Sequence, residues 1–342
     1  MKRILIIGPS WVGDMLMAQT LFRCLRERQP EARIDVLAPP WCSALLELMP
    51  EVNQALPLPI GHGELALGKR WRLAQELRAR AYDQAIVLPN SFKSALIPRF
   101  AGIALRTGWR GEARGLLLND CRVLDKPRYP LMVQRFAALA YAPDAALPDP
   151  LPWPRLRVDT QAARALRESL HLAPDKPALA LCPGAEFGPA KQWPAQHYAA
   201  VARHYAARGW QVWLLGSAKD AAVAEEIIAE SGALVEPPRN LCGITSLTQA
   251  ALLLSEASAV LSNDSGLMHL AAALARPLVV VYGSTSAAFT PPLAERVVTL
   301  SLELPCSPCF KRECPLQHLN CLRQLGPELA LAALDTLLEK TS

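Results

Sequence analysis

Short apolar runs alternate with longer amphipathic stretches along the first half of the chain. Apolar runs of four or five residues are typical of buried parallel strands. Such runs occur at Ile4–Ile7, Ile34–Leu37 and Gln84–Leu88. Apolar residues at helical spacing predict helices at Met15–Arg28, Leu65–Arg80 and Val133–Tyr141. This alternation predicts a parallel sheet that carries helices on both faces.

The second half repeats the alternation. We predict strands at Ala178–Cys182, Gln211–Leu215, Ala259–Leu261 and Leu278–Tyr282. We predict helices at Pro194–Arg208, Ala221–Glu230, Leu247–Ser255, Met268–Ala275 and Pro327–Leu338, with Pro194 at the first helical position. Between the halves, residues 143–154 contain five prolines, a density that prevents regular structure and indicates a stiff linker.

These patterns predict two domains, which a chain of 342 residues is long enough to form. We expect an α/β protein with two Rossmann-like parallel-sheet domains, 1–150 and 151–342, that face each other across a cleft. Parallel sheets of this kind bind ligands at the carboxyl ends of their strands. The polar loops that follow the predicted strands are therefore the first places to look for chemistry.

The composition is that of a soluble globular enzyme, with 51% hydrophobic and 20% charged residues. No apolar run approaches the roughly 18 residues that a membrane helix needs. The N-terminal sequence MKRILIIGPSWVGD is a strand that enters a glycine turn, and its apolar part is too short for a signal peptide. These features predict a cytoplasmic protein.

The net charge of +5 is unevenly distributed along the chain. Residues 1–155 hold 21 Lys and Arg against 14 Asp and Glu, a balance of +7, whereas the remainder has a balance of −2. A basic first half predicts an anionic partner. The sequence contains no aromatic-interleaved basic stripe and no nucleic-acid-binding motif, so we expect no nucleic acid. An acidic glycolipid at a membrane surface is the alternative partner.

A polar turn, Asn-Asp-Ser-Gly, separates a predicted strand from a predicted helix in SNDSGLMHLAAALARP, residues 262–277. Asp264 or Ser265 can cap the helix, and Gly266 allows a ligand to approach the backbone. The unpaired amides of the first turn and the helix dipole favour an anion there. The segment is therefore a candidate diphosphate site, with an ordinary capped helix as the alternative.

The segment GPSWVGD follows the first predicted strand and places Asp14 at a strand-to-helix turn. It matches neither the G-x-G-x-x-G dinucleotide fingerprint nor a P-loop, so its glycines are expected to shape the backbone. Asp14 is a candidate general base that takes a proton from a hydroxyl group. Its alternative role is that of a helix N-cap.

Two loops of the second half also carry candidate ligand-binding residues. In CPGAEFGPAKQWP, residues 182–194, Lys191 precedes a predicted helix and offers a point charge to a phosphate or sugar oxygen. An exposed, solvated lysine is the alternative. In GSAKD, residues 216–220, Asp220 is placed to bind ribose hydroxyls or to cap the next helix.

The nine cysteines form two groups. Five lie among apolar residues and are expected to be small core residues: Cys24, Cys42, Cys121, Cys182 and Cys242. The other four, Cys306, Cys309, Cys314 and Cys321, have the spacing C-x2-C-x4-C-x6-C with His318 nearby. Four thiolates so close could bind a structural zinc ion, although reduced free thiols are the alternative in a cytoplasmic chain.

The motifs together resemble one known family. GPSWVGD, LPNSFKSAL, RTGWRGE, CPGAEFGPAK and NDSGLMH are similar to segments of the heptosyltransferases of lipopolysaccharide core synthesis in Gram-negative bacteria, glycosyltransferase family nine. The resemblance extends to about residue 295. It implies a GT-B fold, with the acceptor on the first domain and the sugar nucleotide on the second. It also implies inverting, metal-independent transfer of L-glycero-D-manno-heptose from ADP-heptose onto the first heptose of the inner core.

The same resemblance assigns roles to residues by position. Asp14 would be the base, and Asp264 would hold hydroxyls of the donor sugar. The backbone of Ser265, Gly266 and Leu267 would hold the diphosphate, with His269 and Lys191 completing the donor site. Asp220, or its neighbours in the GSAKD loop, would face the ribose, and Thr245 would lie near the adenine. No D-x-D triplet suited to a divalent ion is present in the sequence.

The implied acceptor is of the heptosyl-Kdo2-lipid A type, at the inner face of the inner membrane, where the protein would be peripheral. Its acidic sugars would account for the basic first half. Candidate acceptor-binding residues are Lys93, Arg99, Arg106, Arg110 and Arg114, with a solvated basic face as the alternative.

Three other functions stay open from the sequence. One is a sister member of the family that acts on a different core sugar. A nucleotide-binding oxidoreductase with two Rossmann-like domains is the second, and the missing G-x-G-x-x-G argues against it. The third is a protein that binds anionic glycolipid or nucleic acid without catalysis.

Overall fold

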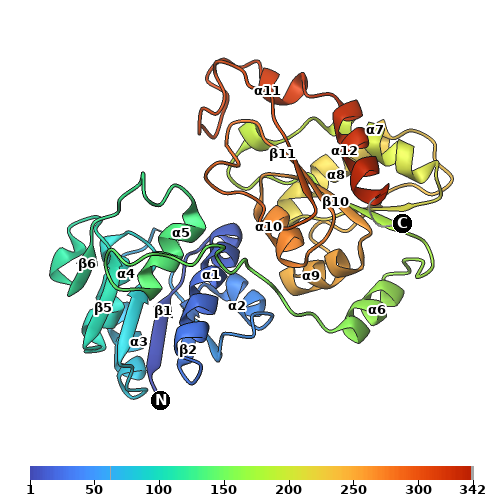
Figure 1. The fold of residues 1–342 in the computed structure, drawn as a ribbon. Helices are drawn as coiled ribbons and strands as arrows, with labels where there is room; N and C mark the ends of the chain where they lie inside the picture. The colour runs from blue at the N-terminus through green and yellow to red at the C-terminus, as the bar shows by residue number, and fades with distance from the viewer. Residues whose placement is uncertain (62, 340–342) are drawn as a thin grey trace. The chain divides into compact units, whose positions relative to one another are not determined.

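The computed structural model describes residues 1–61 and 63–339, which form two compact units (Figure 1). The first unit runs from Met1 to Leu156, and the second begins at Arg157. Every helix in the described part of the chain is too short or too polar to span a bilayer. Each unit contains one sheet and its own core.

The first unit is built on a six-stranded sheet in which all paired strands are parallel. Its strand order is β3-β2-β1-β4-β5-β6, so the order reverses between β1 and β4. The register places Ile4 opposite both Ile34 and Gln84. The strands are β1 (Arg3–Ile7), β2 (Arg33–Ala38), β3 (Gln54–Pro57), β4 (Gln84–Val87), β5 (Leu105–Trp109) and β6 (Asp120–Arg122).

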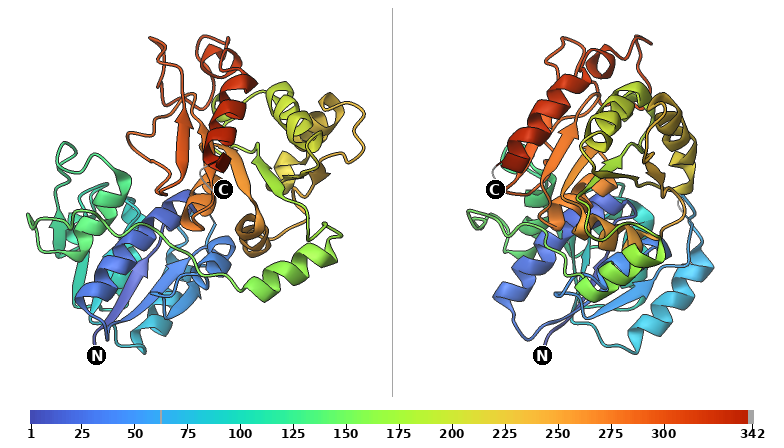
Figure 2. Two further views of the ribbon diagram at one scale, coloured as in Figure 1. Left: turned by 45° about the vertical axis from the view of Figure 1, so that its right-hand side comes forward. Right: turned by 90° about the vertical axis from the view of Figure 1, so that its right-hand side faces the viewer.

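Helices pack on this sheet in two groups, α1 against α5 and α3 against α4 (Figure 2). Ile4 and Ile6 are as fully buried as Leu5, although neighbouring residues of a strand face opposite sides. The continuous apolar run of β1 thus reflects burial on both faces. The helices are α1 (Val12–Arg28), α2 (Pro40–Leu46), α3 (Leu67–Arg78), α4 (Phe92–Phe100) and α5 (Met132–Ala137), with 3-10 turns η1 (Arg114–Leu116) and η2 (Ala138–Ala140).

The second unit repeats the same arrangement. Its strand order is β12-β11-β10-β7-β8-β9, again all parallel, and the order reverses between β7 and β10. Ala259 of β10 lies opposite Leu179 of β7. The strands are β7 (Ala178–Cys182), β8 (Gln211–Leu214), β9 (Arg239–Asn240), β10 (Ala259–Asn263), β11 (Leu278–Val281) and β12 (Val297–Leu300).

The helices of the second unit also form two packed groups. α6 contacts α9, which contacts α10, whereas α7 contacts α8 and α12. The helices are α6 (Thr160–Ser169), α7 (Ala195–Ala206), α8 (Ala221–Glu230), α9 (Leu247–Glu256), α10 (Gly266–Ala273), α11 (Asn320–Arg323) and α12 (Pro327–Glu339), with 3-10 turns η3 (Pro189–Lys191) and η4 (Ala218–Asp220). A core of Leu179, Trp193, Tyr198 and their neighbours lies between α7, α12 and the sheet.

The structure confirms the predicted α/β fold with two parallel sheets. The predicted strands and helices are all present, with ends shifted by a few residues. The prediction for Pro194 was wrong by one position, because it is the N-cap of α7 and Ala195 is the first helical residue. The elements that the pattern missed are short, polar or interrupted: β3, β5, β6, β9, β12, α2, α4, α6 and α11. α4 has a proline inside it, at Pro98.

The proline-rich segment 143–154 contains no helix or strand, as predicted. Its end is fastened to the first unit through Gln19, a fully buried residue of α1. The Gln19 amide donates to the Arg155 carbonyl at 2.7 Å and accepts from the Arg155 N–H at 2.9 Å. These paired bonds fix the course of the chain where it leaves the first unit.

Arg114 is fully buried in the first unit, so its assignment to an exposed acceptor-binding surface was wrong. Its Nε donates to the Trp109 carbonyl at 2.9 Å, and its Nη2 donates to Asn90 Oδ1 at 3.1 Å. Nη1 also donates to the Pro89 carbonyl. The guanidinium therefore ties the loop after β4 to the end of β5, beside the point where the strand order reverses.

We expect Arg114→Ala to destabilise the first unit by roughly 3 kcal/mol or more, because buried carbonyls lose their donor and a cavity forms. Urea unfolding followed by tryptophan fluorescence measures this change. Arg110→Ala, at an exposed position of the same loop region, serves as the control and should shift the unfolding free energy by about 0.5 kcal/mol at most. Equal stabilities of the two variants would contradict the structural role of Arg114.

Candidate functional site

The candidate site of the second unit lies at the carboxyl ends of β7 and β10, where the strand order reverses. Open parallel sheets bind ligands at this point because neighbouring loops diverge to opposite faces and leave a crevice. The loop after β7 leads to Lys191, and the turn after β10 holds Asp264 and Ser265. The fold thus brings the two strongest motifs of the second half together.

Asn263, the last residue of β10, fastens the loop that carries Lys191. Its side chain is fully buried. Nδ2 donates to the Pro183 carbonyl at 2.6 Å, and Oδ1 accepts from the Trp193 N–H at 3.1 Å and from the Tyr198 hydroxyl at 3.0 Å. One amide therefore holds the loop 183–193 at both ends. Asn263 was given no role from the sequence, although an asparagine at the carboxyl end of an apolar strand is a signal for one.

Lys191 and Asp264 form an ion pair in this site. Lys191 Nζ lies 2.6 Å from Asp264 Oδ2, and the two side chains are 14% and 5% exposed. The hydroxyl of Thr285 donates to the same carboxylate oxygen at 2.5 Å. Lys191 is thus mostly buried and paired, which argues against the alternative of an exposed, solvated lysine. Thr285 was missed because nothing in its local sequence marks it.

The N-terminus of α10 points its first amides into the same region. Ser265 is the N-cap, with extended backbone angles, and its hydroxyl accepts from the Met268 N–H at 3.4 Å. Asp264 therefore does not cap this helix, which was the other role that the sequence allowed for it. The amides of Gly266 and Leu267 belong to the first turn, where helical N–H groups have no partner within the helix. The dipole of α10 adds partial positive charge at this end.

His269 lies one turn into α10 and is buried, with 7% of its surface exposed. The pKa of His269 is lowered to about 4, chiefly by burial; the Asp264 carboxylate opposes this shift and the Lys191 cation adds to it. The imidazole is therefore neutral near pH 7. It can donate or accept a hydrogen bond beside the ion pair, but it does not add a third charge.

Asp220 lies at the neighbouring loop, close to the start of the Lys191 loop. A Cβ on Gly184 would come within 2.6 Å of the Asp220 carboxyl group, so a side chain at position 184 would displace this carboxyl group. Asp220 Oδ2 accepts from the Ser217 N–H and from the Ser217 hydroxyl, both at 2.8 Å. Asp220 thus closes a capping box at η4, whereas its side chain makes no capping hydrogen bond to α8, the helix that it was expected to cap.

Thr245 is placed farther along the same edge. Its hydroxyl donates to the Leu241 carbonyl at 3.4 Å. The preceding Gly243 packs against Ala218 of η4, and a Cβ there would lie 2.7 Å from Ala218 Cα. The Thr245 loop and the Asp220 loop therefore touch, although neither contacts the Lys191–Asp264 pair in the described hydrogen bonds and ion pairs.

Asp14 lies at the candidate site of the first unit, in the first turn of α1 after β1. Trp11 occupies the N-cap position, so Asp14 is not the cap that the alternative interpretation required. Burial raises the pKa of the Cys42 thiol to about 11, and the Asp14 carboxylate adds to this shift, which places Cys42 beside it. Trp41 Nε1 donates to the Ser10 carbonyl at 2.9 Å and so holds the turn before Asp14.

The basic residues expected to bind the acceptor fall into two groups. Arg99 and Arg110 are exposed and Lys93 is partly exposed. Arg106 is half-buried, and its guanidinium donates to the carbonyls of Leu117 at 2.7 Å and Ile103 at 2.5 Å. Arg106, like the buried Arg114, is therefore largely committed to its own backbone.

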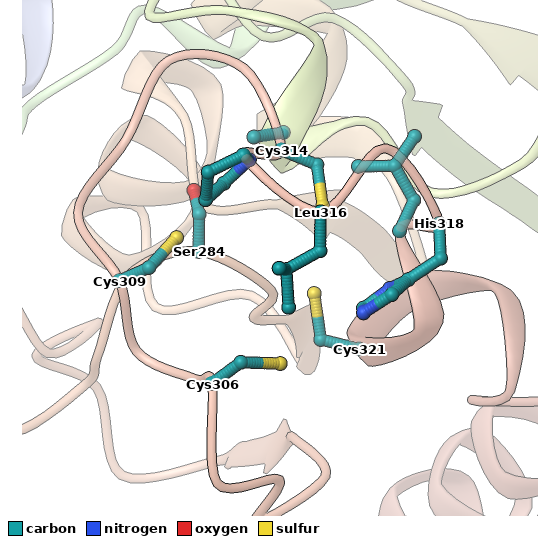
Figure 3. A pocket seen from close by; sticks show the side chains of 10 residues that line it. Ser284, Cys306, Cys309, Cys314, Leu316, His318 and Cys321 are labelled. Carbon is teal, nitrogen blue, oxygen red and sulfur yellow. The ribbon is translucent and has the colours of Figure 1, made fainter.

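The four C-terminal cysteines line a small pocket together with Ser284, Leu316 and His318 (Figure 3). Backbone N–H groups, foremost that of Leu319, lower the pKa of the Cys314 thiol, whereas burial raises that of Cys321. Within the described residues, no group of three or more His, Cys, Asp or Glu side chains is placed to hold a metal ion. The zinc site considered from the spacing is therefore not supported.

All nine cysteines are free thiols. Four of the five scattered cysteines are buried as expected, whereas Cys121 is only partly buried.

Comparison with known proteins gives a consistent result. Residues 70–320 match the family model of glycosyltransferase family 9 (heptosyltransferase). Lipopolysaccharide heptosyltransferase 2 of Salmonella typhimurium is 49% identical to this chain in an alignment that covers 99% of both proteins. The protein of the same name from Escherichia coli K12 is 49% identical, with 98% of both proteins covered.

A solved structure, that of E. coli ADP-heptose lps heptosyltransferase II, has the same fold. It superposes with a TM-score of 0.89 at 47% identity, and the match covers 100% of this chain and 99% of that one. Two Rossmann-like units in one chain are the components of a GT-B glycosyltransferase, and both are present here. The family model, which matches most of the chain, and the relatives aligned over nearly its full length indicate the same family. The chain belongs to glycosyltransferase family 9, the heptosyltransferases.

Proposed function

We propose that this chain transfers L-glycero-D-manno-heptose from ADP-heptose to the first heptose of the lipopolysaccharide inner core, as a heptosyltransferase II. The observation that carries the proposal is the Lys191–Asp264 ion pair at the N-terminus of α10. A buried cation, unpaired helix amides and a carboxylate for sugar hydroxyls converge there. A nucleoside diphosphate sugar needs these three kinds of partner.

The leaving group is ADP, which departs with the bonding electrons of the anomeric C–O bond. Its diphosphate binds to the backbone amides of Ser265, Gly266 and Leu267. Lys191 supplies positive charge to the same oxygens, and because the site is largely buried this charge is weakly screened. These groups stabilise the departing negative charge, so the mechanism needs no metal ion. Asp264 accepts hydrogen bonds from hydroxyls of the donor heptose.

Inversion at the anomeric carbon follows from a single displacement. The acceptor hydroxyl oxygen forms the new bond on the face opposite ADP, and its proton passes to the carboxylate of Asp14. Asp14 lies on the first unit, which we assign to the acceptor, and the donor groups lie on the second. Asp220 is assigned to the ribose and Thr245 to the neighbourhood of the adenine.

The exposed cations Arg99 and Arg110, with Lys93, are assigned to the acidic acceptor of the heptosyl-Kdo2-lipid A type. A sister activity on a different core sugar is the nearest alternative, because the donor site itself does not encode the acceptor. The oxidoreductase and the non-catalytic alternatives lose their basis, since the family is one of glycosyltransferases.

Attachment to the inner face of the inner membrane is supported by a surface patch at the start of α3. Leu65, Leu67 and Trp71 are 49%, 50% and 55% exposed, and Leu67 and Trp71 lie one turn apart on the helix. Arg70, buried beneath them, donates to the Leu65 carbonyl at 2.7 Å and fixes the chain before the helix.

Basic side chains flank this patch. Lys69 and Arg72 are both exposed on the same helix. Exposed apolar side chains beside cations fit the interface of an anionic bilayer, where the former insert among headgroups and the latter pair with phosphates. The protein is therefore proposed to be cytoplasmic and peripheral, with this face toward the lipid that bears its acceptor.

The proposed activity predicts a specific loss in Asp14→Asn. The amide cannot accept the proton of the attacking hydroxyl, so kcat with ADP-heptose and heptosyl-Kdo2-lipid A should fall by about a hundredfold or more, while the KM for ADP-heptose changes little. Product formation is followed by mass spectrometry of the acceptor. Glu27→Gln, on the exposed face of the same helix, is the control and should keep normal turnover. Normal kcat in Asp14→Asn would remove Asp14 from the mechanism.

The neutral state of His269 predicts sensitivity to acid. The unfolded chain takes up this proton near pH 6.5 and the folded chain only near pH 4, so the unfolded state binds more protons between these values. The free energy of unfolding should therefore fall by roughly 2 to 3 kcal/mol more in the wild type than in His269→Gln as the pH drops from 7 to 4.5. Urea unfolding at both pH values measures the difference.

The control for this experiment is His171→Asn, at an exposed histidine of the same unit, which should leave the wild-type pH dependence unchanged. Parallel pH profiles of the wild type and His269→Gln would show that His269 does not titrate as the structure requires.

The membrane patch predicts selective binding to anionic vesicles. In co-sedimentation, the wild type should bind vesicles that contain phosphatidylglycerol more strongly than pure phosphatidylcholine vesicles. The double variant Leu67→Ser/Trp71→Ser should bind the anionic vesicles about fivefold or more weakly, since it loses apolar area that inserts. Leu329→Ser, on the exposed side of α12, is the matched control. Unchanged binding of the double variant would place the membrane contact elsewhere.

A further inference from the structure

The cysteine loop, residues 304–319, is in direct contact with the loop that carries Lys191. The Ala190 N–H donates to the Arg312 carbonyl at 3.0 Å. A Cβ on Gly188 would lie 2.5 Å from the same oxygen, and the φ of Gly188 is 152°. The backbone of the cysteine loop therefore touches the Lys191 loop at Gly188 and Ala190, three residues and one residue before Lys191. At Gly188 only glycine leaves room for this contact.

The cysteine loop also binds the segment that follows β11. The Phe310 N–H donates to the Ser284 carbonyl at 2.7 Å, and the Ser307 hydroxyl donates to the Gly283 carbonyl at 2.6 Å. The next residue, Thr285, is the one that donates to Asp264. The loop is thus bonded to the backbone on both sides of the Lys191–Asp264 pair.

These contacts bring the side chains of Arg312 and Lys191 to the same aromatic ring, that of Phe187. The Arg312 guanidinium carbon lies 5.5 Å from the centre of the Phe187 ring, and Lys191 Nζ lies 4.9 Å from the same centre. An aromatic ring attracts cations to its face, so Phe187 holds two cations close to one site. Arg312 is exposed and forms no ion pair within residues 1–61 and 63–339.

The charge balance of the donor site gives Arg312 a role. Lys191 is already paired with Asp264, and this pair carries no net charge. The N-terminus of α10 contributes only about half an elementary charge. A diphosphate brings more negative charge than these groups offset. Arg312 is a nearby cation without a carboxylate partner, and its planar guanidinium suits phosphate oxygens.

We propose that Arg312 is a second diphosphate-binding cation of the donor site and that the cysteine loop is the element that presents it. This inference rests on the proposed function, because it takes the ligand to be ADP or an ADP-sugar. It gives the C-terminal segment a role in the site without a metal ion. The contacts with Ala190 and Ser284 involve backbone atoms, so they persist when the Arg312 side chain is replaced.

Isothermal titration of the full-length chain with ADP tests the proposal. Arg312→Gln should raise the Kd for ADP at least tenfold, because a charged hydrogen-bonded contact is lost. Arg312→Lys should recover part of the affinity. Lys311→Gln, an equally exposed neighbour in the loop, is the matched control and should bind ADP as the wild type does. An Arg312→Gln variant that binds ADP as tightly as Lys311→Gln overturns the proposal.

Steady-state kinetics distinguish a failure of the Arg312 proposal from a failure of the proposed function. The KM for ADP-heptose should rise in Arg312→Gln, whereas the KM for the acceptor should stay within about twofold of the control. If the wild type binds ADP but transfers no heptose, the proposed function fails, while the binding comparison still tests Arg312. If the wild type transfers heptose and Arg312→Gln keeps the wild-type KM for the donor, only the role of Arg312 is overturned.

Discussion

The buried amide of Asn263 is the interaction on which the Lys191–Asp264 site of the second unit depends. It stands at the end of the central strand β10 and bonds to both ends of the loop 183–193. A loop of this length would otherwise sample many conformations, and ordering it costs entropy residue by residue. Fixing its two ends to a buried side chain reduces that freedom, and Lys191 is then held opposite Asp264, the residue next to Asn263. The position of β10 in the sheet thus sets the geometry of the Lys191–Asp264 ion pair.

This anchoring matters because the pair has little water around it. Two charges that are mostly buried interact strongly, but each also loses hydration, so the net stabilisation is small unless further hydrogen bonds complete the shell. Thr285 supplies one such bond to the carboxylate. The neutral imidazole of His269 adds no charge next to Lys191. In a site arranged in this way, the oxygens of a ligand can replace one partner of the Lys191–Asp264 pair, and the side chains of the protein need to move little.

Several residues that the structure brings together here were named from the sequence, and the omissions have physical causes. Residues that follow strands in polar turns, such as Asp264 and Ser265, were found because parallel strands deliver their carboxyl ends to one edge. Thr285 and Arg312 were not identified from the sequence because their roles depend on contacts between segments far apart in the chain. Arg114 was misassigned because a charge pattern does not reveal whether a guanidinium meets water or buried carbonyls. Short edge strands such as β6 carry too few apolar residues to produce a periodic signal.

The two units have the same strand order, yet the first turns of α1 and α10 differ in charge. In the first unit the first turn of α1 contains Asp14, so the positive end of the helix dipole already faces a carboxylate. In the second unit the first turn of α10 contains no acidic residue, and a neutral serine caps it. The dipole and the amides of α10 therefore remain available to an external anion. Under the proposed function, this difference lets the first turn of α1 present a base to the acceptor and lets the first turn of α10 bind the diphosphate of the donor.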